Sequence, residues 1–227
     1  MNINDISYLN ITKAMKRGTA EALENTDDAV FIREKRSGVF FMACDDPDLG
    51  MKLLEKHEDM GYHLLVIFDT KLADRAFEKY GFTERLDCWQ AAYLGPIPEV
   101  SDELRVRVAT LDDLDAITAN YDLVSSEEVK ISVEYGDVLV GFDKEDNMVG
   151  FIGEHTDGSG GMLYVFPEHR RKGYGAEFEK HLFIKNITEG FIPFGHVVKD
   201  NFASMELQRS MGLTIADKPA CWLWKEE

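Results

Sequence analysis

The chain contains few cysteines and no long apolar run. Its three cysteines, Cys44, Cys88 and Cys221, are too few and too scattered for a disulfide framework or a zinc site, so reduced thiols and no metal are expected. No apolar stretch approaches the roughly 20 residues that cross a bilayer. The first ten residues lack the basic and apolar regions of a secretory signal. We therefore expect a cytoplasmic protein that does not enter membranes.

Positive charge is also scarce. The 25 Lys and Arg residues stand against 42 Asp and Glu, which gives a formal net charge of −17 at pH 7. A charge of this sign excludes nucleic-acid binding through the overall field. It is compatible with a cationic or amine-bearing partner, although solubility alone is a sufficient explanation. The apolar content of 44% and charged content of 30% are typical of a folded globular protein.

A proline-containing segment, L-G-P-I-P-E-V-S at 94–101, separates two patterned halves and predicts a boundary between domains at 1–97 and 98–227. In the second half, hydrophobic periodicity predicts a mixed α/β order, β-α-α-β-β-β-α-β-α-β. The expected strands are 104–109, 137–143, 148–153, 161–166, 193–198 and 221–224, and the expected helices are 110–117, 125–134, 173–189 and 201–210.

The first half repeats part of this pattern, with expected strands at 39–44, 63–69 and 88–93 and a helix at 70–79. Asp69 and Gly81 have counterparts at equal spacing in Asp200 and Gly212, and Cys88 and Cys221 each precede a tryptophan. This shared register predicts an internal duplication into two related α/β units. The alternative is that residues 1–95 form an unrelated small α/β domain.

A cluster of cations and glycines, R-R-K-G-Y-G-A at 170–176, lies between an expected strand and an expected helix. The first N–H groups of a helix have no internal partner and carry partial positive charge, so they attract anions. Glycines at 173 and 175 would let a diphosphate approach the backbone. The spacing matches neither a Walker A loop nor the three-glycine dinucleotide motif. The alternative is a basic patch whose glycines only shape a turn.

The cluster fits the Arg/Gln-x-x-Gly-x-Gly/Ala signature of the GNAT superfamily of N-acetyltransferases. Together with V-K-D-N-F-A-S (198–204) and L-Q-R-S-M-G-L (207–213), it is most similar to the branch that includes glycine N-acyltransferase. The resemblance covers roughly residues 104–227. It implies a GNAT fold with a mixed central sheet, here preceded by a smaller, degenerate GNAT-like α/β unit.

The resemblance implies acetyl-CoA as acyl donor. The backbone of the strand before the turn would bind the pantetheine arm, the turn would cradle the pyrophosphate, and two polar residues would line the cofactor. On this chain these positions are Leu163, Tyr164 and Val165; Arg170, Arg171, Lys172, Gly173, Tyr174, Gly175 and Ala176; and Asn201 and Ser204. From the sequence alone, Asn201 could equally be a helix cap and Ser204 a solvent-facing residue.

The implied activity is direct transfer of the acetyl group to the amine of a small molecule or amino acid. Many members have a tyrosine acid where this chain has Gln208. Glu154 and His155, at the end of a strand, are the best candidates for the base, with a solvated strand end as the alternative. His196 is a further candidate, and the transfer could rely on positioning and water-mediated proton loss.

The corresponding turn of the first half, D-D-P-D-L-G-M-K at 45–52, has acidic residues in place of the cations and would repel a diphosphate. One acyl-CoA site per chain is therefore expected. Two other readings stay open, a non-catalytic acyl-CoA-binding sensor and a binder of another phosphorylated ligand. The acidic surface mildly favours a polyamine or aminoglycoside acceptor, and a homodimer is left open.

Overall fold

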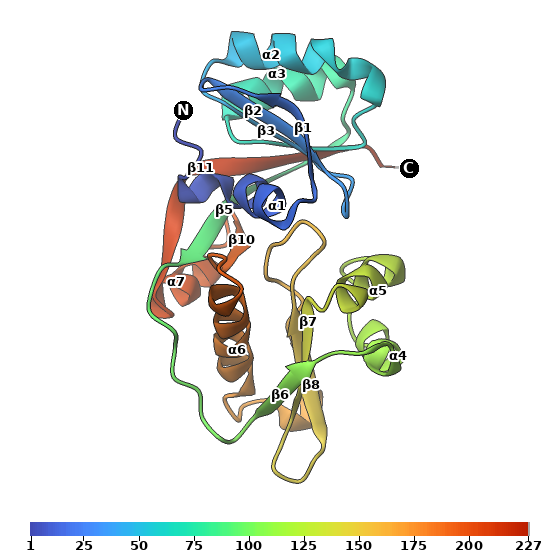
Figure 1. Ribbon diagram of the computed structural model, residues 1–227, viewed down its shortest axis with the longest axis vertical. Helices are drawn as coiled ribbons and strands as arrows, with labels where there is room; N and C mark the ends of the chain where they lie inside the picture. Colours follow the sequence, from blue (N-terminus) through green and yellow to red (C-terminus); the bar gives the residue numbers. More distant parts are fainter. Residues whose placement is uncertain (227) are drawn as a thin grey trace. The chain divides into compact units, whose positions relative to one another are not determined.

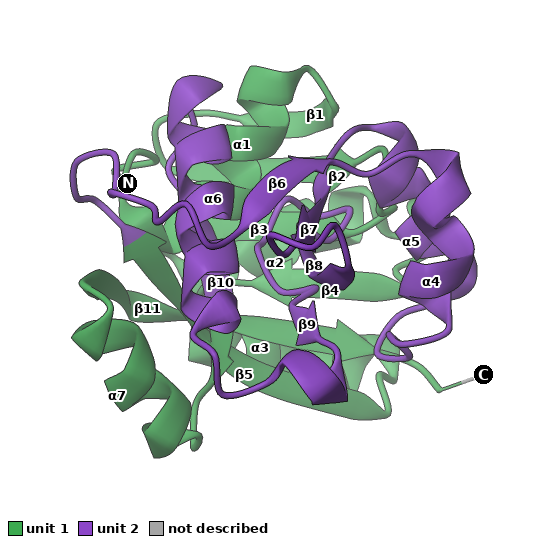
Figure 2. Cartoon of the chain, turned by 90° about the horizontal axis from the view of Figure 1, so that it is seen from below, with its two compact units in different colours: residues 1–92, 196–227 green, residues 93–195 purple. Residues whose placement is uncertain are grey.

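The computed structural model describes residues 1–226, which form two compact units (Figure 2). Unit 1 comprises residues 1–92 and 196–227, and unit 2 comprises residues 93–195. Within residues 1–226, no helix has both the length and the apolar character that crossing a bilayer requires.

The helices and strands of unit 1 include a segment from each end of the chain (Figure 1). They are the 3₁₀ helices η1 (Ile6–Tyr8) and η2 (Glu58–Met60), helices α1 (Leu9–Arg17), α2 (Pro47–Lys56), α3 (Thr70–Tyr80) and α7 (Phe202–Ser210), and strands β1 (Ala20–Asn25), β2 (Ala29–Glu34), β3 (Phe40–Cys44), β4 (Leu64–Ile67), β5 (Glu84–Tyr93) and β11 (Leu213–Trp224).

These strands build a mixed seven-stranded sheet in the order β1-β2-β3-β4-β11-β5-β10, where β10 (Phe194–Val198) begins in unit 2. Strands β3 and β4 are parallel, whereas β4 pairs antiparallel with β11. Helices α2 and α3 cover one face of the sheet and α1 covers the other (Figure 1). Each face therefore has its own apolar core, as expected for a sheet buried on both sides.

Helices α3 and α7 have similar ends, although their caps are one residue out of the predicted repeat register, in which Asp69 corresponds to Asp200. The duplication itself stays a prediction. Asp69 caps α3 by accepting from Leu72 N at 2.8 Å, and Asn201 caps α7 by accepting from Ser204 N at 3.0 Å. Both helices are followed by a left-handed glycine, Gly81 with φ 63° before β5 and Gly212 with φ 82° before β11. Such caps satisfy the end groups that every helix leaves unpaired.

The compact units differ from the predicted division at residues 97 and 98. The N-terminal junction lies close to the expected one, but residues 196–227 pack with residues 1–92. The reason is β11, which runs from Leu213 to Trp224 and pairs with β4 of the N-terminal part. Only its last four residues were predicted as strand, so this pairing did not emerge from the sequence.

Unit 2 is a four-stranded antiparallel sheet with helices on both faces. Its elements are strands β6 (Arg105–Val108), β7 (Val138–Phe142), β8 (Met148–Gly153) and β9 (Tyr164–Val165), the 3₁₀ helices η3 (Leu111–Asp113) and η4 (Pro167–His169), and helices α4 (Leu114–Thr118), α5 (Ser126–Glu134) and α6 (Tyr174–Thr188). Helices α4 and α5 cover one face and α6 the other (Figure 1).

Helix α6 packs closely against β7 at Gly141. A Cβ at this position would lie 2.5 Å from Cζ of Phe178 and 2.9 Å from Cδ1 of Leu104. Both neighbours belong to the apolar core between α6 and the sheet. Gly141 therefore sets how near the helix lies to the strand.

Gly141→Ala is expected to destabilise the protein by about 1–3 kcal/mol, because the added methyl group overpacks this core. Urea unfolding measures the change. Gly175→Ala is the matched control, since its Cβ would meet no atom closer than 4.0 Å. Equal stability of the Gly141→Ala variant and the wild type would contradict the close packing.

Candidate functional site

Strand β9 lies at the edge of the four-stranded sheet, with β8 as its partner. Phe166 N donates to Val149 O at 2.9 Å and Met162 N to Gly153 O at 3.2 Å, so both point toward β8. Because backbone direction alternates along a strand, the Val165 N–H group points away from β8. The observed strand, Tyr164–Val165, is shorter than the predicted strand at 161–166. Its side away from β8 is an open edge of the four-stranded sheet.

Before β9, the chain meets the start of β10 through a parallel bridge between Gly160 and Gly195. Gly160 N donates to Phe194 O at 2.7 Å, and a Cβ on Gly195 would lie 2.8 Å from Gly160 O. Glycine is required at 195 for this close approach. After the bridge, β9 continues in the four-stranded sheet and β10 in the seven-stranded sheet. Within residues 1–226, the bridge precedes β9, and β9 and β10 are not neighbours in either sheet.

The turn after β9 leads into α6 without a side-chain cap. Gly173 is the N-cap residue in a left-handed conformation, φ 85°, and no side chain accepts from the first turn. Arg171 is also left-handed, φ 65°. Alternating left-handed residues turn successive N–H groups toward one concave side, which is an anion-binding arrangement. The N–H groups of residues 174–176 add the partial positive charge of a 15-residue helix.

The space beside the two glycines of this turn is open. A Cβ on Gly173 would meet no atom within 4 Å, and one on Gly175 would meet only Cδ2 of Leu163, at 4.0 Å. Close packing against other protein atoms is therefore not the reason for glycine at positions 173 and 175. The conformation of Gly173 and the open space both fit a diphosphate group bound against the backbone.

Arg171 and Lys172 are exposed, and no ion pair or hydrogen bond is described for either side chain. On a chain with net charge −17, two neighbouring cations without acidic partners are available to an anionic ligand. Arg170 is arranged differently. Its Nε donates to Val165 O at 2.9 Å and its guanidinium lies 5.4 Å from the centre of the Tyr164 ring. Arg170 thus lies along β9 in this structure.

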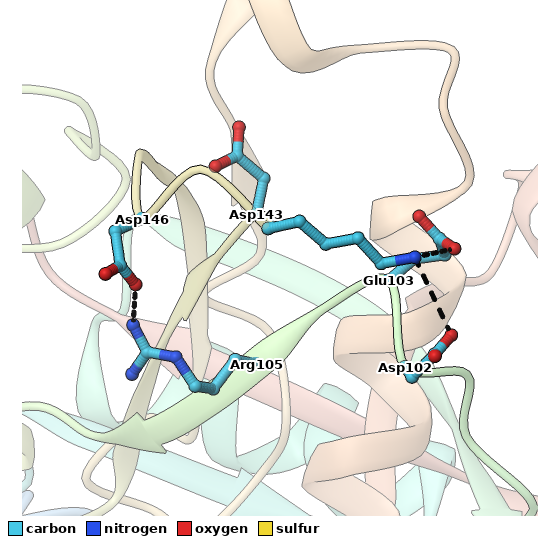
Figure 3. Close-up of a pocket in the computed structure, with 6 residues that line it drawn as sticks. Asp102, Glu103, Arg105, Asp143 and Asp146 are labelled. Carbon is cyan, nitrogen blue, oxygen red and sulfur yellow. Dashed lines mark hydrogen bonds and ion pairs between the residues drawn. The ribbon is translucent and has the colours of Figure 1, made fainter.

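A surface pocket of unit 2 is mainly acidic, in contrast to the cationic turn (Figure 3). Arg105 forms an ion pair with Asp146, Lys144 forms one with Glu103, and Lys144 lies 3.9 Å from Asp102. With Asp143, four carboxylates and two cations line the pocket. Both cations have carboxylate partners, so this pocket does not attract a diphosphate.

Helix α2 occupies the equivalent place in the first half and is capped by its own chain. Asp46 accepts from Asp48 N at 2.9 Å and from Leu49 N at 3.4 Å. Its carboxylate thereby occupies the place that an anionic ligand would take. This cap gives a physical reason for the sequence prediction that the turn before α2 binds no diphosphate. The absence of binding itself stays a prediction.

The other predicted cofactor residues, Asn201 and Ser204, belong to unit 1. The side chain of Asn201 caps α7 by accepting from Ser204 N, which is the alternative role considered for it. Gln208 is half-buried on the same helix. His196 packs edge-on against Trp222, with ring centres 5.3 Å apart. Roles of these residues in binding or catalysis stay predictions.

The two predicted catalytic residues point to opposite faces of the unit 2 sheet. Glu154 is buried and accepts a hydrogen bond from Asn186 of α6. His155 is partly exposed on the α5 side, where its Nδ1 lies 3.6 Å from Glu128 Oε1 and its Nε2 lies 3.5 Å from the Tyr121 hydroxyl. His155 is the more accessible of the two candidates.

The surroundings of His155 favour its protonated form. Burial lowers the pKa of His155, but the nearby carboxylates of Glu128 and Asp157 outweigh it, so the pKa is raised. Sequence reasoning found His155 but missed Glu128. The sequence S-S-E-E at 125–128 has the pattern of a capping box, with a glutamate three residues after the capping serine, and this pattern could have drawn attention to Glu128.

Within residues 1–226, no group of three His, Cys, Asp or Glu side chains is placed to hold a metal ion. The arrangement instead combines an uncapped helix start beside an open strand edge with a basic side chain on the same unit.

The fold is that of GNAT proteins. A structural-genomics X-ray structure of a Drosophila protein superposes with a TM-score of 0.68 at 15% identity, over 98% of this chain and 91% of that one. A GCN5-related N-acetyltransferase from Kribbella flavida gives 0.58 at 12% identity, over 98% and 95% of the two chains. A GCN5-related N-acetyltransferase-like protein from Streptococcus suis gives 0.58 at 13% identity, over 95% and 92%.

The model of the FR47-like protein family matches residues 140–223, which include β9, the cationic turn and α6. No curated protein sequence matches the chain. The GNAT fold with its mixed sheet, expected from the sequence, is confirmed by the structural matches. The narrower similarity to the glycine N-acyltransferase branch stays a prediction.

Gly173→Asp is expected to weaken CoA binding by at least about tenfold, because a carboxylate would stand at the uncapped helix start, as Asp46 does at α2. Isothermal titration calorimetry measures the affinity. Gly173→Asn is the control, since asparagine has nearly the same shape, tolerates a left-handed conformation and carries no charge. Equal affinities of the Asp and Asn variants would contradict an anion site at this position.

Proposed function

We propose that the protein is an N-acyltransferase that transfers an acetyl group from acetyl-CoA to the amine of a small molecule or amino acid. The observation that carries the proposal is the uncapped start of α6, with Arg171 and Lys172 unpaired beside it, directly after an edge strand. The GNAT fold supports acyl transfer as the class of reaction, because structures that share it are N-acetyltransferases.

The donor would be held by two features of unit 2. The N–H groups of residues 174–176 and the cations at 171 and 172 would bind the diphosphate. The open edge of β9 would bind the pantetheine arm through the backbone of Leu163 and Val165. The Val165 N–H group, which points away from β8, is placed to donate to the thioester oxygen when it becomes negatively charged.

In the transfer, the acceptor's ammonium group first loses a proton to the base, for which His155 is the accessible candidate. The free amine nitrogen then attacks the thioester carbonyl carbon to form a tetrahedral intermediate with a negatively charged oxygen. The carbonyl re-forms as the C–S bond breaks and the thiolate leaves. The attacking nitrogen loses its second proton, which neutralises the leaving thiolate through water. The products are the amide and CoA with a free thiol.

The reaction is tested by mixing the protein with acetyl-CoA and a panel of amines and amino acids and measuring thiol release. Turnover with at least one acceptor is expected. CoA binding without turnover across the panel would instead favour the non-catalytic sensor, a reading that the glutamine at position 208 keeps open.

The charge-reversed variant Arg171→Glu/Lys172→Glu is expected to bind CoA at least about tenfold more weakly, because two charge-assisted contacts are lost. Lys52→Glu/Lys71→Glu makes the same change in net charge at two exposed positions of unit 1 and is the control. Calorimetry compares the two. Similar weakening in both variants would show that only the overall charge matters.

A further inference from the structure

We propose that Glu128 is a positioning residue that fixes the orientation and tautomer of His155, so that the Nε2 atom of His155 is the proton acceptor of the transfer. This rests on the proposed function, because the proton comes from the acceptor amine. Neither residue touches the cationic turn, so the inference depends on a separate set of contacts in unit 2.

The position of Glu128 follows from the start of α5. Ser125 caps this helix by accepting from Glu128 N at 3.2 Å. In a complete capping box, the Glu128 carboxylate would in turn accept from the Ser125 backbone. Here only the serine half is formed, and the Glu128 Oε1 atom accepts from the Thr156 hydroxyl at 3.3 Å and lies 3.6 Å from His155 Nδ1. The carboxylate is thus directed to the histidine.

The contact with Glu128 determines which ring nitrogen carries the proton in neutral His155. A carboxylate can only accept, so the Nδ1 atom that faces it must hold a hydrogen. The lone pair is then on Nε2. The Tyr121 hydroxyl lies 3.5 Å from Nε2 and is placed to donate to it. Burial raises the pKa of Tyr121 to about 12, so this hydroxyl stays protonated at neutral pH.

The ring of His155 is also fixed by the chain that leads to β9. A Cβ on Gly161 would lie 2.5 Å from Nε2 and 2.8 Å from Cδ2 of His155, so the imidazole fills the space that any other residue would need there. Gly161 precedes Leu163 by two residues. His155 Nε2 is therefore held beside the beginning of the strand segment that is proposed to carry the thioester.

His155 and Glu128 remain accessible to a small acceptor. Their side chains are 22% and 29% exposed, whereas Glu154 is fully buried. The titratable groups that act on His155 are Glu128 from α5, Asp157 from the following turn and Tyr121 from the segment after α4. In the proton step, the ammonium group loses a proton to Nε2, and the resulting imidazolium is stabilised by the Glu128 carboxylate.

The proposal is tested on the full chain by following the imidazole C–H signal of His155 in NMR titrations, with His155→Gln used to assign it. In Glu128→Gln the His155 pKa is expected to fall by about one unit, because the negative charge 3.6 Å from Nδ1 is lost. Glu128→Asp should restore part of the shift. Glu127→Gln is the matched control, since Glu127 is the exposed carboxylate next in the same helical turn.

The same variants are compared in the transfer assay. In Glu128→Gln, kcat is expected to fall about 10- to 100-fold with the KM for acetyl-CoA nearly unchanged. This is less than the roughly 10²- to 10⁴-fold that a general base contributes, because the imidazole itself is still present. The rise of kcat with pH should move to lower pH together with the His155 pKa, because His155 then loses its proton more easily.

An unchanged His155 pKa in Glu128→Gln would overturn the proposal. A shifted pKa with an unchanged pH profile of kcat would overturn the role of His155 as proton acceptor. If the wild type releases no thiol with any amine, the proposed function fails, and the titration alone still decides whether Glu128 positions His155.

Discussion

The proposed acyl-CoA site depends on the N–H groups at the start of α6, which no side chain caps. A helix of this length leaves its first N–H groups without internal partners, and most helices satisfy them with a side chain. In α6 the N-cap residue is Gly173, which has no side chain to offer. A bound anion would satisfy these N–H groups. It would also pair with the cations at 171 and 172 and occupy the open space beside the glycines, next to the exposed edge of β9.

Helices α2 and α6 differ in how the N–H groups at their starts are satisfied. Both helices follow a strand in a β-α-β-α-β order, as a duplicated unit would. At α2 the partner of the N–H groups is built in as Asp46. A single capping residue therefore separates a closed helix start from an open one. That the N-terminal part binds no CoA stays a prediction.

Much of this could be predicted from the sequence because the relevant signals are local. The cationic turn, the helix that follows it and the cap at Asn201 depend on groups only a few residues apart in the sequence. Most predicted helices and strands of residues 104–210 lie within one or two residues of their observed bounds. Strand β9 is shorter than predicted, because its regular ladder with β8 covers Tyr164 and Val165, and Met162 and Phe166 on either side make single hydrogen bonds to β8.

Features that depend on distant contacts were not predicted. The hairpin of β1 and β2 and helix α1 received no assignment, and β11 begins eight residues before the predicted strand because it pairs with β4. The contact between Glu128 and His155 joins residues from a helix and from the end of a strand, and no spacing rule connects them. Contacts between residues far apart in the sequence depend on how the strands and helices pack, so they are known only from the structure.

The most direct measurement is a titration of isotope-labelled protein with CoA, followed through backbone amide signals. The signals of Tyr174, Gly175 and Ala176, at the uncapped start of α6, should shift strongly. Those of Asp48 and Leu49, which Asp46 already caps at α2, should not move. Unmoved signals at residues 174–176, or equal shifts at both helices, would contradict the central claim.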